Sequence, residues 1–246
     1  MQYQARPDRN VQLRTTIQEL AQQHRRYGYR RIYRLLRRRG QKVNKKRVQR
    51  LWQHAKLQVA RVRRKRRRPA HPPPQQASYP NHVWTYDFVK DRCLSGTPLR
   101  ILTVMDEFTR QGLAIAVRRS FPARQVLVVL DGLFKEHGSP AYLRSDNGPE
   151  FVALIVRGWL HEQQVQTLYI DPGCPWQNGY EERFNGTVRD EFLNSYAFAS
   201  VAEAQVLAAA YLREYNEERP HSSLGYLTPL EFKRDWYARQ SAEDGL

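Results

Sequence analysis

The apolar residues between positions 10 and 57 recur at helical spacing and predict three short helices. Residues 11–21 carry the first repeat, which ends before Gly28, and residues 32–36 carry the second, which stops at Gly40. Asn44 is placed as the N-cap of a third helix. The apolar face of that helix comprises Val48, Leu51, Trp52 and Ala55. Three short helices with a glycine-containing turn between the last two are typical of a helix-turn-helix unit.

Beyond residue 80 the pattern changes to alternating strands and helices. Strands are predicted at 82–89, 99–105, 113–117, 142–144 and 165–170. Helices are predicted at 123–137, 151–163, 178–193, 201–218 and 229–239. This order predicts an α/β fold, a mixed sheet flanked by helices.

The stretch between the two parts has the composition of a linker. Residues 61–68 are almost all Arg and Lys, and residues 69–80 contain five prolines, which favours an extended, semi-rigid segment. We therefore expect a basic helix-turn-helix domain at 1–60, a polybasic and Pro-rich linker at 61–80, an α/β core at 81–195 and a C-terminal helical extension at 196–246.

Charge separates the same parts and indicates the partner. The formal charge is +17, but residues 1–75 hold 24 Lys and Arg against two acids, whereas the remainder is net acidic. Such a head attracts nucleic acid; an acidic membrane surface is the weaker alternative because the head has no lipid-facing aromatic stripe. The chain has no membrane-spanning apolar run and no signal-peptide core. Two distant cysteines predict no structural zinc, and we expect a cytoplasmic protein.

Three carboxylates are the candidates for chemistry. Asp87 lies in an otherwise apolar strand, where a carboxylate is costly unless a cation or donors meet it, although an edge-strand position facing water is the alternative. Asp146 follows a short strand, where α/β proteins bind ligands, although Asp-Asn-Gly is also an ordinary turn. Asp106, Glu107 and Asp171 are expected to cap strands or make turns.

Glu182 lies on the predicted helix 178–193, where two stripes separate at about 100° per residue. The apolar stripe, expected in the core, comprises Tyr180, Phe184, Val188 and Phe192. The opposite stripe comprises Glu182, Asn185, Gly186 and Arg189. That polar stripe is either solvated or part of a functional site. The Gly- and Pro-rich loop before the helix would allow DNA to approach such a site.

Oxygen ligands alone suit Mg²⁺ or Mn²⁺ and disfavour zinc. Asp87, Asp146 and Glu182 together would hold two Mg²⁺ ions, for which Mn²⁺ could substitute. Such a pair supports in-line displacement at phosphorus.

The spacing of these residues resembles the DDE motif of the retroviral-integrase and transposase superfamily. Thirty-five residues separate Asp146 from Glu182, and Arg189 follows seven after Glu182. The segments 145–151, 175–186, 215–226 and 27–32 further resemble the second-frame transposase of frameshifting bacterial insertion sequences. The resemblance implies a ribonuclease H-like integrase core at 81–195 and a DNA transposase that cuts and joins strands at element ends.

The chain departs from the family pattern in two places. The basic helical head replaces the His/Cys zinc module of retroviral integrases. Position 181 is Glu where these transposases are expected to hold an apolar residue. Spacing selects Glu182 as the ligand, since Glu181 points about 100° away.

DNA contacts are expected from three groups of residues. A recognition helix in the major groove would use side chains opposite the apolar face, and the polybasic tract would follow phosphates. A solvated helical bundle and a nuclear localisation signal are the alternative interpretations of the two regions. The expected contacts are Lys45, Lys46, Gln49, Arg50 and Gln53 on the helix, Arg63, Arg64, Lys65, Arg66 and Arg67 in the tract, and Asn178, Asn185 and Arg189 in the core.

Two other functions share part of this pattern. A ribonuclease H-like nuclease without joining activity would have the same metal site, and a DNA-binding regulator would keep the head with an inactive core. For a transposase, the resemblance implies double-stranded DNA as partner, a homo-oligomer on paired ends and a possible first-frame companion protein.

Overall fold

The computed structural model describes residues 9–59, 75–146, 148, 154–171 and 175–243, in two compact units that divide at Arg66. The first unit contains α1 (Val11–Gln23), α2 (Tyr29–Arg38) and α3 (Lys45–His54). Their buried faces meet in one apolar cluster that includes Ile17, Leu36 and Trp52. The Asn44 side chain accepts a hydrogen bond from the Lys46 amide at 2.8 Å, as expected of the N-cap.

The second unit is built on a five-stranded mixed sheet in the order β3-β2-β1-β4-β5. Its strands are β1 (Val83–Arg92), β2 (Pro98–Asp106), β3 (Gly112–Arg118), β4 (Tyr142–Ser145) and β5 (Gln166–Tyr169). β1 lies at the centre, antiparallel to β2 and parallel to β4. The predicted α/β fold class is therefore confirmed.

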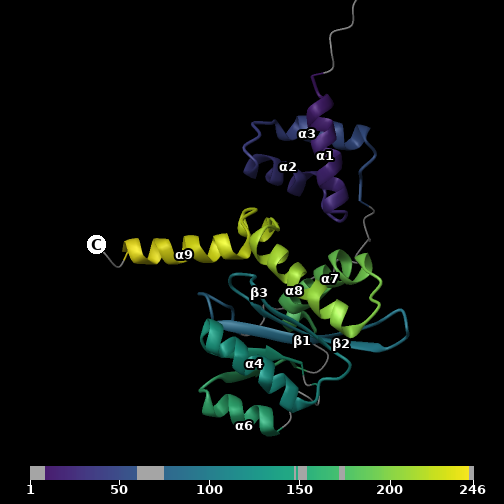
Figure 1. Ribbon diagram of the computed structural model, residues 1–246. Coiled ribbons are helices and arrows are strands. Elements are labelled where there is room, and N and C mark those ends of the chain that lie inside the picture. Colours follow the sequence, from purple (N-terminus) through teal and green to yellow (C-terminus); the bar gives the residue numbers. More distant parts are fainter. Residues whose placement is uncertain (1–8, 60–74, 147, 149–153, 172–174, 244–246) are drawn as a thin grey trace, which may run out of the picture. The chain divides into compact units, whose positions relative to one another are not determined.

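Helices cover both faces of this sheet (Figure 1). α4 (Ala123–His137) and α6 (Leu154–Glu162) pack on one face, over a core that contains Trp84, Leu102 and Leu143. α7 (Gly179–Glu191) and α8 (Val201–Glu217) pack on the other, over Ile101, Ile115 and Val117. Short 3-10 turns lie at Pro175–Asn178, Leu193–Ser195 and Ser222–Leu224.

The first part of β1 is buried on both faces, which explains its near-continuous apolar sequence. At Gly112 the packing is close, and a larger residue would displace neighbouring side chains. A Cβ there would lie 2.8 Å from Leu212 Cδ1 on α8 and 3.0 Å from Phe184 Cζ on α7. α8 was expected in a C-terminal extension, but it shares the hydrophobic core with the sheet.

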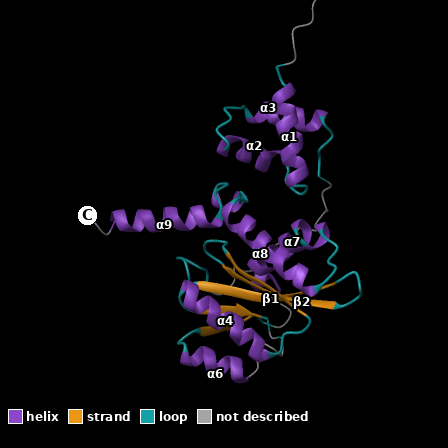
Figure 2. Cartoon of the chain, in the orientation of Figure 1, coloured by secondary structure: helices purple, strands orange, loops and turns teal. Residues whose placement is uncertain are grey.

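The last helix, α9 (Pro229–Glu243), extends away from the sheet and is longer than the expected 229–239 (Figure 2). The start of the helix predicted at 151–163 falls among residues outside the description, and α6 is described from Leu154. Within the described ranges, no helix has the length and apolar character needed to cross a membrane.

Candidate active site

Asp87 is half-buried on the central strand, and both of its carboxylate oxygens accept hydrogen bonds. Oδ1 accepts from the Phe88 amide at 2.6 Å, and Oδ2 accepts from the Asn185 side chain on α7 at 3.0 Å. Burial raises the pKa of Asp87 to about 6, and the negative charges of Asp146 and Glu182 add to the rise, while the two donors oppose it. Both carboxylates that the sequence singled out thus act on Asp87, and the neighbouring Glu181 is also coupled to it.

Strand pairing explains how Asp146 comes to this position. β4 runs parallel to β1, with Thr85 opposite Arg144, so that Asp146 follows at the carboxyl end of β4 near the level of Asp87. Asp146 Oδ1 accepts from the Gly148 amide at 2.9 Å, which is the turn that Asp-Asn-Gly favours. The turn holds the carboxylate at the strand's end through Oδ1.

Glu182 lies in the first turn of α7 and is exposed. Its charge acts on Asp87, yet no group of three or more His, Cys, Asp or Glu side chains lies close enough together to hold a metal ion within the residues that the structure describes. The three carboxylates therefore face one region without closing around a single point. Like charges that raise the pKa of Asp87 are the setting that a divalent cation would neutralise.

Three polar contacts fasten α7 to β1. At its start, Asn178 Oδ1 accepts from the Thr85 hydroxyl at 2.6 Å. Midway, Asn185 binds Asp87 and accepts from the Thr103 hydroxyl at 2.8 Å. Towards its end, Arg189 donates to the Lys90 carbonyl at 2.7 Å and lies 3.9 Å from Asp91. These contacts fix the register of the helix that carries Glu182.

The same contacts change the interpretation of three residues expected on DNA. Asn178 is only 5 % exposed, so that the expectation of a DNA contact there is wrong. The Asn185 amide is engaged with Asp87 and Thr103. Arg189 remains exposed, although its guanidinium also contacts β1. The polar stripe of α7 thus contacts β1 through Asn185 and Arg189, while Glu182 and Arg189 are exposed.

Glu181, next to Glu182 and about 100° away from it around the helix, is completely buried. Neither of its carboxylate oxygens has a hydrogen-bond partner in the described part of the chain. Burial raises the pKa of Glu181 well above its usual value. The Thr103 hydroxyl offsets part of the rise, but its single proton also has Asn185 Oδ1 and the Asp87 carbonyl as acceptors. Glu181 is therefore buried as an apolar residue would be, with Thr103, Asp87 and Glu107 as the polar groups that act on it.

Beneath the site lies an ion pair that the sequence did not predict. Arg144 Nε and Glu107 Oε1 are 2.8 Å apart, and the two side chains are 1 % and 0 % exposed. Arg144 also donates to the Gln75 carbonyl at 2.6 Å, which joins β4 to the segment that precedes β1. Asp106 has the capping role that was expected, since it accepts from the amides of Phe108, Thr109 and Asn81.

The segment 215–226, to which the sequence gave no role, joins three elements. Arg219 makes a two-pronged contact with Glu191 at the end of α7, at 2.6 and 2.7 Å. The Asn216 side chain accepts from the Gly112 amide and donates to its carbonyl, at 2.9 and 2.8 Å. We refer to Asn216, Arg219 and Glu191 as the clamp. It connects the end of α8 to β3 and to α7, the helix that carries Glu182.

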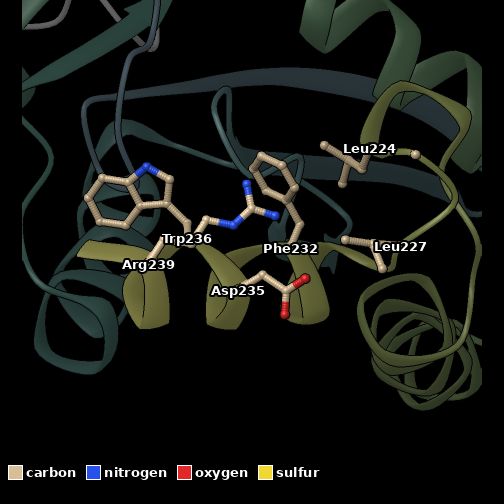
Figure 3. Close-up of a pocket in the computed structure, with 7 residues that line it drawn as sticks. Leu224, Leu227, Phe232, Asp235, Trp236 and Arg239 are labelled. Atoms are coloured by element: carbon tan, nitrogen blue, oxygen red, sulfur yellow. The ribbon is translucent and has the colours of Figure 1, made fainter. Parts of the chain in front are cut away.

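A hollow of about 440 Å³ lies where α9 begins (Figure 3). Phe232 and Trp236 line it, and the same two rings lie 5.6 and 6.0 Å from the ring of Phe108. None of the candidate carboxylates lines this hollow. It is separate from the site around Asp87.

On the first unit, the predicted contact residues of α3 lie opposite its buried face. Lys45, Lys46, Arg50 and Gln53 are exposed and Gln49 is half-buried. Val48, Leu51 and Trp52 are buried. The predicted contacts Arg63, Arg64, Lys65, Arg66 and Arg67 lie outside the described residues.

Three family models match the chain. One described as an HTH-like domain covers residues 7–66, and two described as an integrase core domain cover residues 77–175 and 163–229. Together they span both units.

Curated relatives match over nearly the whole chain. It is 41 % identical over 235 residues to the insertion element IS407 uncharacterized 31.7 kDa protein of Burkholderia multivorans, with 94 % of this chain and 84 % of that protein covered. Identity to the insertion element IS476 uncharacterized 39.2 kDa protein of Xanthomonas euvesicatoria is 40 %, with 93 % of this chain covered but only 66 % of that protein. The transposase InsD for insertion element IS2 of Escherichia coli is 29 % identical and is covered to 76 %, against 89 % of this chain.

Solved structures show a likeness of fold. The HTLV-2 integrase catalytic core domain in complex with magnesium superposes with a TM-score of 0.53 at 14 % identity, over 64 % of this chain and 99 % of that one. The simian T-cell lymphotropic virus intasome in complex with the PP2A regulatory subunit B56 gamma gives 0.59 at 14 % identity, over 89 % of this chain and 74 % of that one. The integrase-type, ribonuclease H-like arrangement of the core follows from this likeness.

Proposed function

This chain belongs to the family of insertion-element transposases, with a helix-turn-helix-like domain followed by an integrase core, and from that premise we propose that it cuts and joins DNA strands at the ends of its element. The proposed catalytic residues are Asp87, Asp146 and Glu182. The observation that carries the proposal is the geometry around Asp87: the pairing of β1 with β4 brings Asp146 near its level, and Asn185 ties it to α7, the helix that carries Glu182.

The donor set fits two magnesium ions, with manganese as a substitute, because it consists of carboxylate oxygens with no sulphur or imidazole. The HTLV-2 core that shares the fold was solved with magnesium. Bound ions would activate the attacking oxygen and stabilise the leaving one in an in-line displacement at phosphorus.

The chain's own residues supply orientation. The Phe88 amide and Asn185 hold the Asp87 carboxylate in one rotamer, so that its remaining lone pairs point to a fixed place. The Gly148 amide does the same for Asp146. The contacts of α7 with β1 limit how far Glu182 can move from Asp87 and Asp146.

We further propose that α3 recognises the element ends in the major groove, through Lys45, Lys46, Gln49, Arg50 and Gln53. Arg63, Arg64, Lys65, Arg66 and Arg67 would add sequence-independent phosphate contacts. The enzyme would work in the bacterial cytoplasm as a homo-oligomer on paired ends, and a viral intasome is among the structures that share its fold. A first-frame companion protein is also part of the proposal, as the resemblance to second-frame transposases implies.

One observation favours a second candidate, a DNA-binding regulator without chemistry. The carboxylates in the described ranges do not form a closed cluster of three. A regulator would bind element ends through the head and would show no metal-dependent cleavage.

A strand-transfer assay tests the proposal. Labelled duplex bearing the ends that flank the element is incubated with the full chain and Mg²⁺ or Mn²⁺, and cleaved and joined products are resolved. We expect both products from the wild type and neither from Asp87→Asn. Cleavage without joining would identify a nuclease, end binding without either product would identify the regulator, and activity retained in Asp87→Asn would refute the triad.

A further inference from the structure

The far end of the sheet has one face that the helices leave open. Along the last residues of β1, Val89 is buried on the side of α7 and α8, whereas Lys90 and Arg92 on the other side are exposed. The same alternation occurs where β2 begins, with Leu99 buried and Arg100 partly exposed. At this end the sheet is therefore covered on one face only.

Strand register gathers basic side chains on this open face. Lys90 pairs with Arg100, and Arg100 pairs with Arg118. Partners directly opposite in an antiparallel pair point to the same face, and adjacent strands lie about 4.8 Å apart. Three cationic side chains thus stand side by side across β1, β2 and β3, with Arg92 next in line on β1. We refer to Lys90, Arg92, Arg100 and Arg118 as the basic platform.

Aromatic rings hold two of these guanidinium groups. Arg100 lies 4.2 Å from the centroid of the Phe88 ring, and Arg118 lies 5.7 Å from that of Phe121. The two rings are themselves 5.6 Å apart. A guanidinium stacked on a ring keeps its donors directed sideways and outwards, and it loses less conformational freedom when it binds an anion.

The surrounding charges strengthen the platform. Successive side chains of a strand point to opposite faces, so that the acidic Asp91 of β1 points away from the platform. There Arg189 of α7 lies 3.9 Å from it. Arg119 and Arg124, which follow β3 in the chain, are both exposed. Basic side chains therefore predominate at the platform, although the second half of the chain is net acidic.

The platform lies close to the candidate catalytic carboxylates. Lys90 is three residues along β1 from Asp87, a distance of about 10 Å, but the two side chains point to opposite faces of the sheet, Asp87 towards α7 and Lys90 away from it. The pairing of β1 with β4 ends at Thr85 and Arg144, so that Asp87 and the residues up to Arg92 follow along the edge of β1 that β4 leaves. A duplex laid across this edge would meet Asp87 from one face and the platform from the other.

We propose that the basic platform binds the phosphate backbone of the acceptor duplex, the DNA into which a cleaved end is joined; this inference rests on the proposed function. A row of Lys and Arg on a flat sheet face contacts phosphates but has no element that enters a groove to read bases. An acceptor of arbitrary sequence needs only such contacts, whereas the element end is the DNA that a recognition helix would select.

The test compares Lys90→Glu/Arg118→Glu with Arg157→Glu/Arg234→Glu, which makes the same charge change at exposed residues of α6 and α9. Each full-length protein receives labelled element-end DNA and an unlabelled plasmid of unrelated sequence as acceptor. Joining is expected to fall about tenfold or more in the platform variant, with end cleavage within about twofold of the wild type and the control variant unaffected. Unchanged joining, or an equal loss of cleavage and joining, would overturn the proposal.

If the wild type neither cleaves nor joins DNA, the proposed function fails. A DNA-binding measurement still tests the platform in that case. Anisotropy of an unrelated fluorescent duplex is followed against salt, with all variants in the Asp87→Asn background. The platform substitutions should reduce the slope of log K against log salt by about 2, at about 0.9 for each phosphate contact, and the control should not. A slope equal to that of the control would refute the platform by this independent route.

Discussion

At the scale of single residues, the candidate site contains carboxylates whose burial lowers the free energy of unfolding. Asp87 is half-buried beside two further negative charges, and its pKa is raised from 3.8 to about 6. The folded state therefore holds a proton more tightly than the unfolded state does. By linkage, stability falls as pH rises from about 4 through 6, and the cost above pH 6 is at most about 3 kcal/mol.

Asp87→Asn is accordingly expected to stabilise the metal-free protein at pH 8, by about 1–3 kcal/mol. Asn185 can turn its amide to accept from the new side chain, because the Thr103 hydroxyl both donates and accepts. Urea unfolding in EDTA at pH 8 and pH 4.5 measures the effect. The gain should shrink at the lower pH, and an equal gain at both would contradict the raised pKa.

Glu181 makes a second residue-scale prediction. A fully buried carboxyl without a hydrogen-bond partner among the described residues destabilises the fold, so that Glu181→Leu should raise the free energy of unfolding by about 1–3 kcal/mol. DNA joining should survive this change. Loss of joining in Glu181→Leu, with the fold intact, would mean that Glu181 and not Glu182 is the ligand.

At the scale of elements, the clamp sets the position of α7. The Arg219 and Glu191 side chains are only 6 % and 9 % exposed, and α8 also presses on α7 through Tyr215 and Phe184, whose rings are 5.0 Å apart. Removing one partner of a buried ion pair leaves the other charged and desolvated.

Arg219→Gln is therefore expected to lower the free energy of unfolding by about 3–5 kcal/mol. The exposed Arg213→Gln on α8, the helix that precedes Arg219, is the matched control and should change it by less than about 0.5 kcal/mol. The double variant Arg219→Met/Glu191→Leu should recover most of the loss, since no charge is left unpaired. Similar losses for Arg213→Gln and Arg219→Gln would contradict a buried pair.

The elements themselves were predictable because each has a local signature. Asn44 caps α3, Gly40 follows α2 with φ of +78°, and the apolar stripe of α7 with Phe184 and Val188 is buried as its spacing required. What joins the elements was not predictable. The pairing of Arg219 with Glu191 and of Asn178 with Thr85 depends on strand register and helix packing, which leave no local pattern in one sequence. Hence Asn178 was expected on DNA and is instead buried.

At the scale of the whole molecule, the chain divides a positive head from a core that is net acidic but carries one positive face. The head's charge is expected to supply most of the DNA affinity by release of counterions. Recognition and chemistry are thereby assigned to different units.

Lys45→Ala/Lys46→Ala should lower the salt slope of element-end binding by about 2 if both lysines contact phosphate. Lys135→Ala/Arg157→Ala, on α4 and α6, is the matched control because these exposed residues lie on the core unit. Anisotropy titrations at about 50 to 300 mM KCl give the slopes. If the head and control variants had the same slope, α3 would not be the element that meets DNA.

The central claim, that Glu182 completes a catalytic triad with Asp87 and Asp146, is tested most directly by strand transfer with Glu182→Gln beside Glu181→Gln. The two changes are chemically identical and adjacent on α7, but one side chain is exposed near Asp87 and the other is buried. We predict that Glu182→Gln lowers metal-dependent joining by at least about 100-fold, because a direct ligand should matter more than a second-layer partner, and that Glu181→Gln retains it. Equal activity of Glu182→Gln and the wild type would contradict the account.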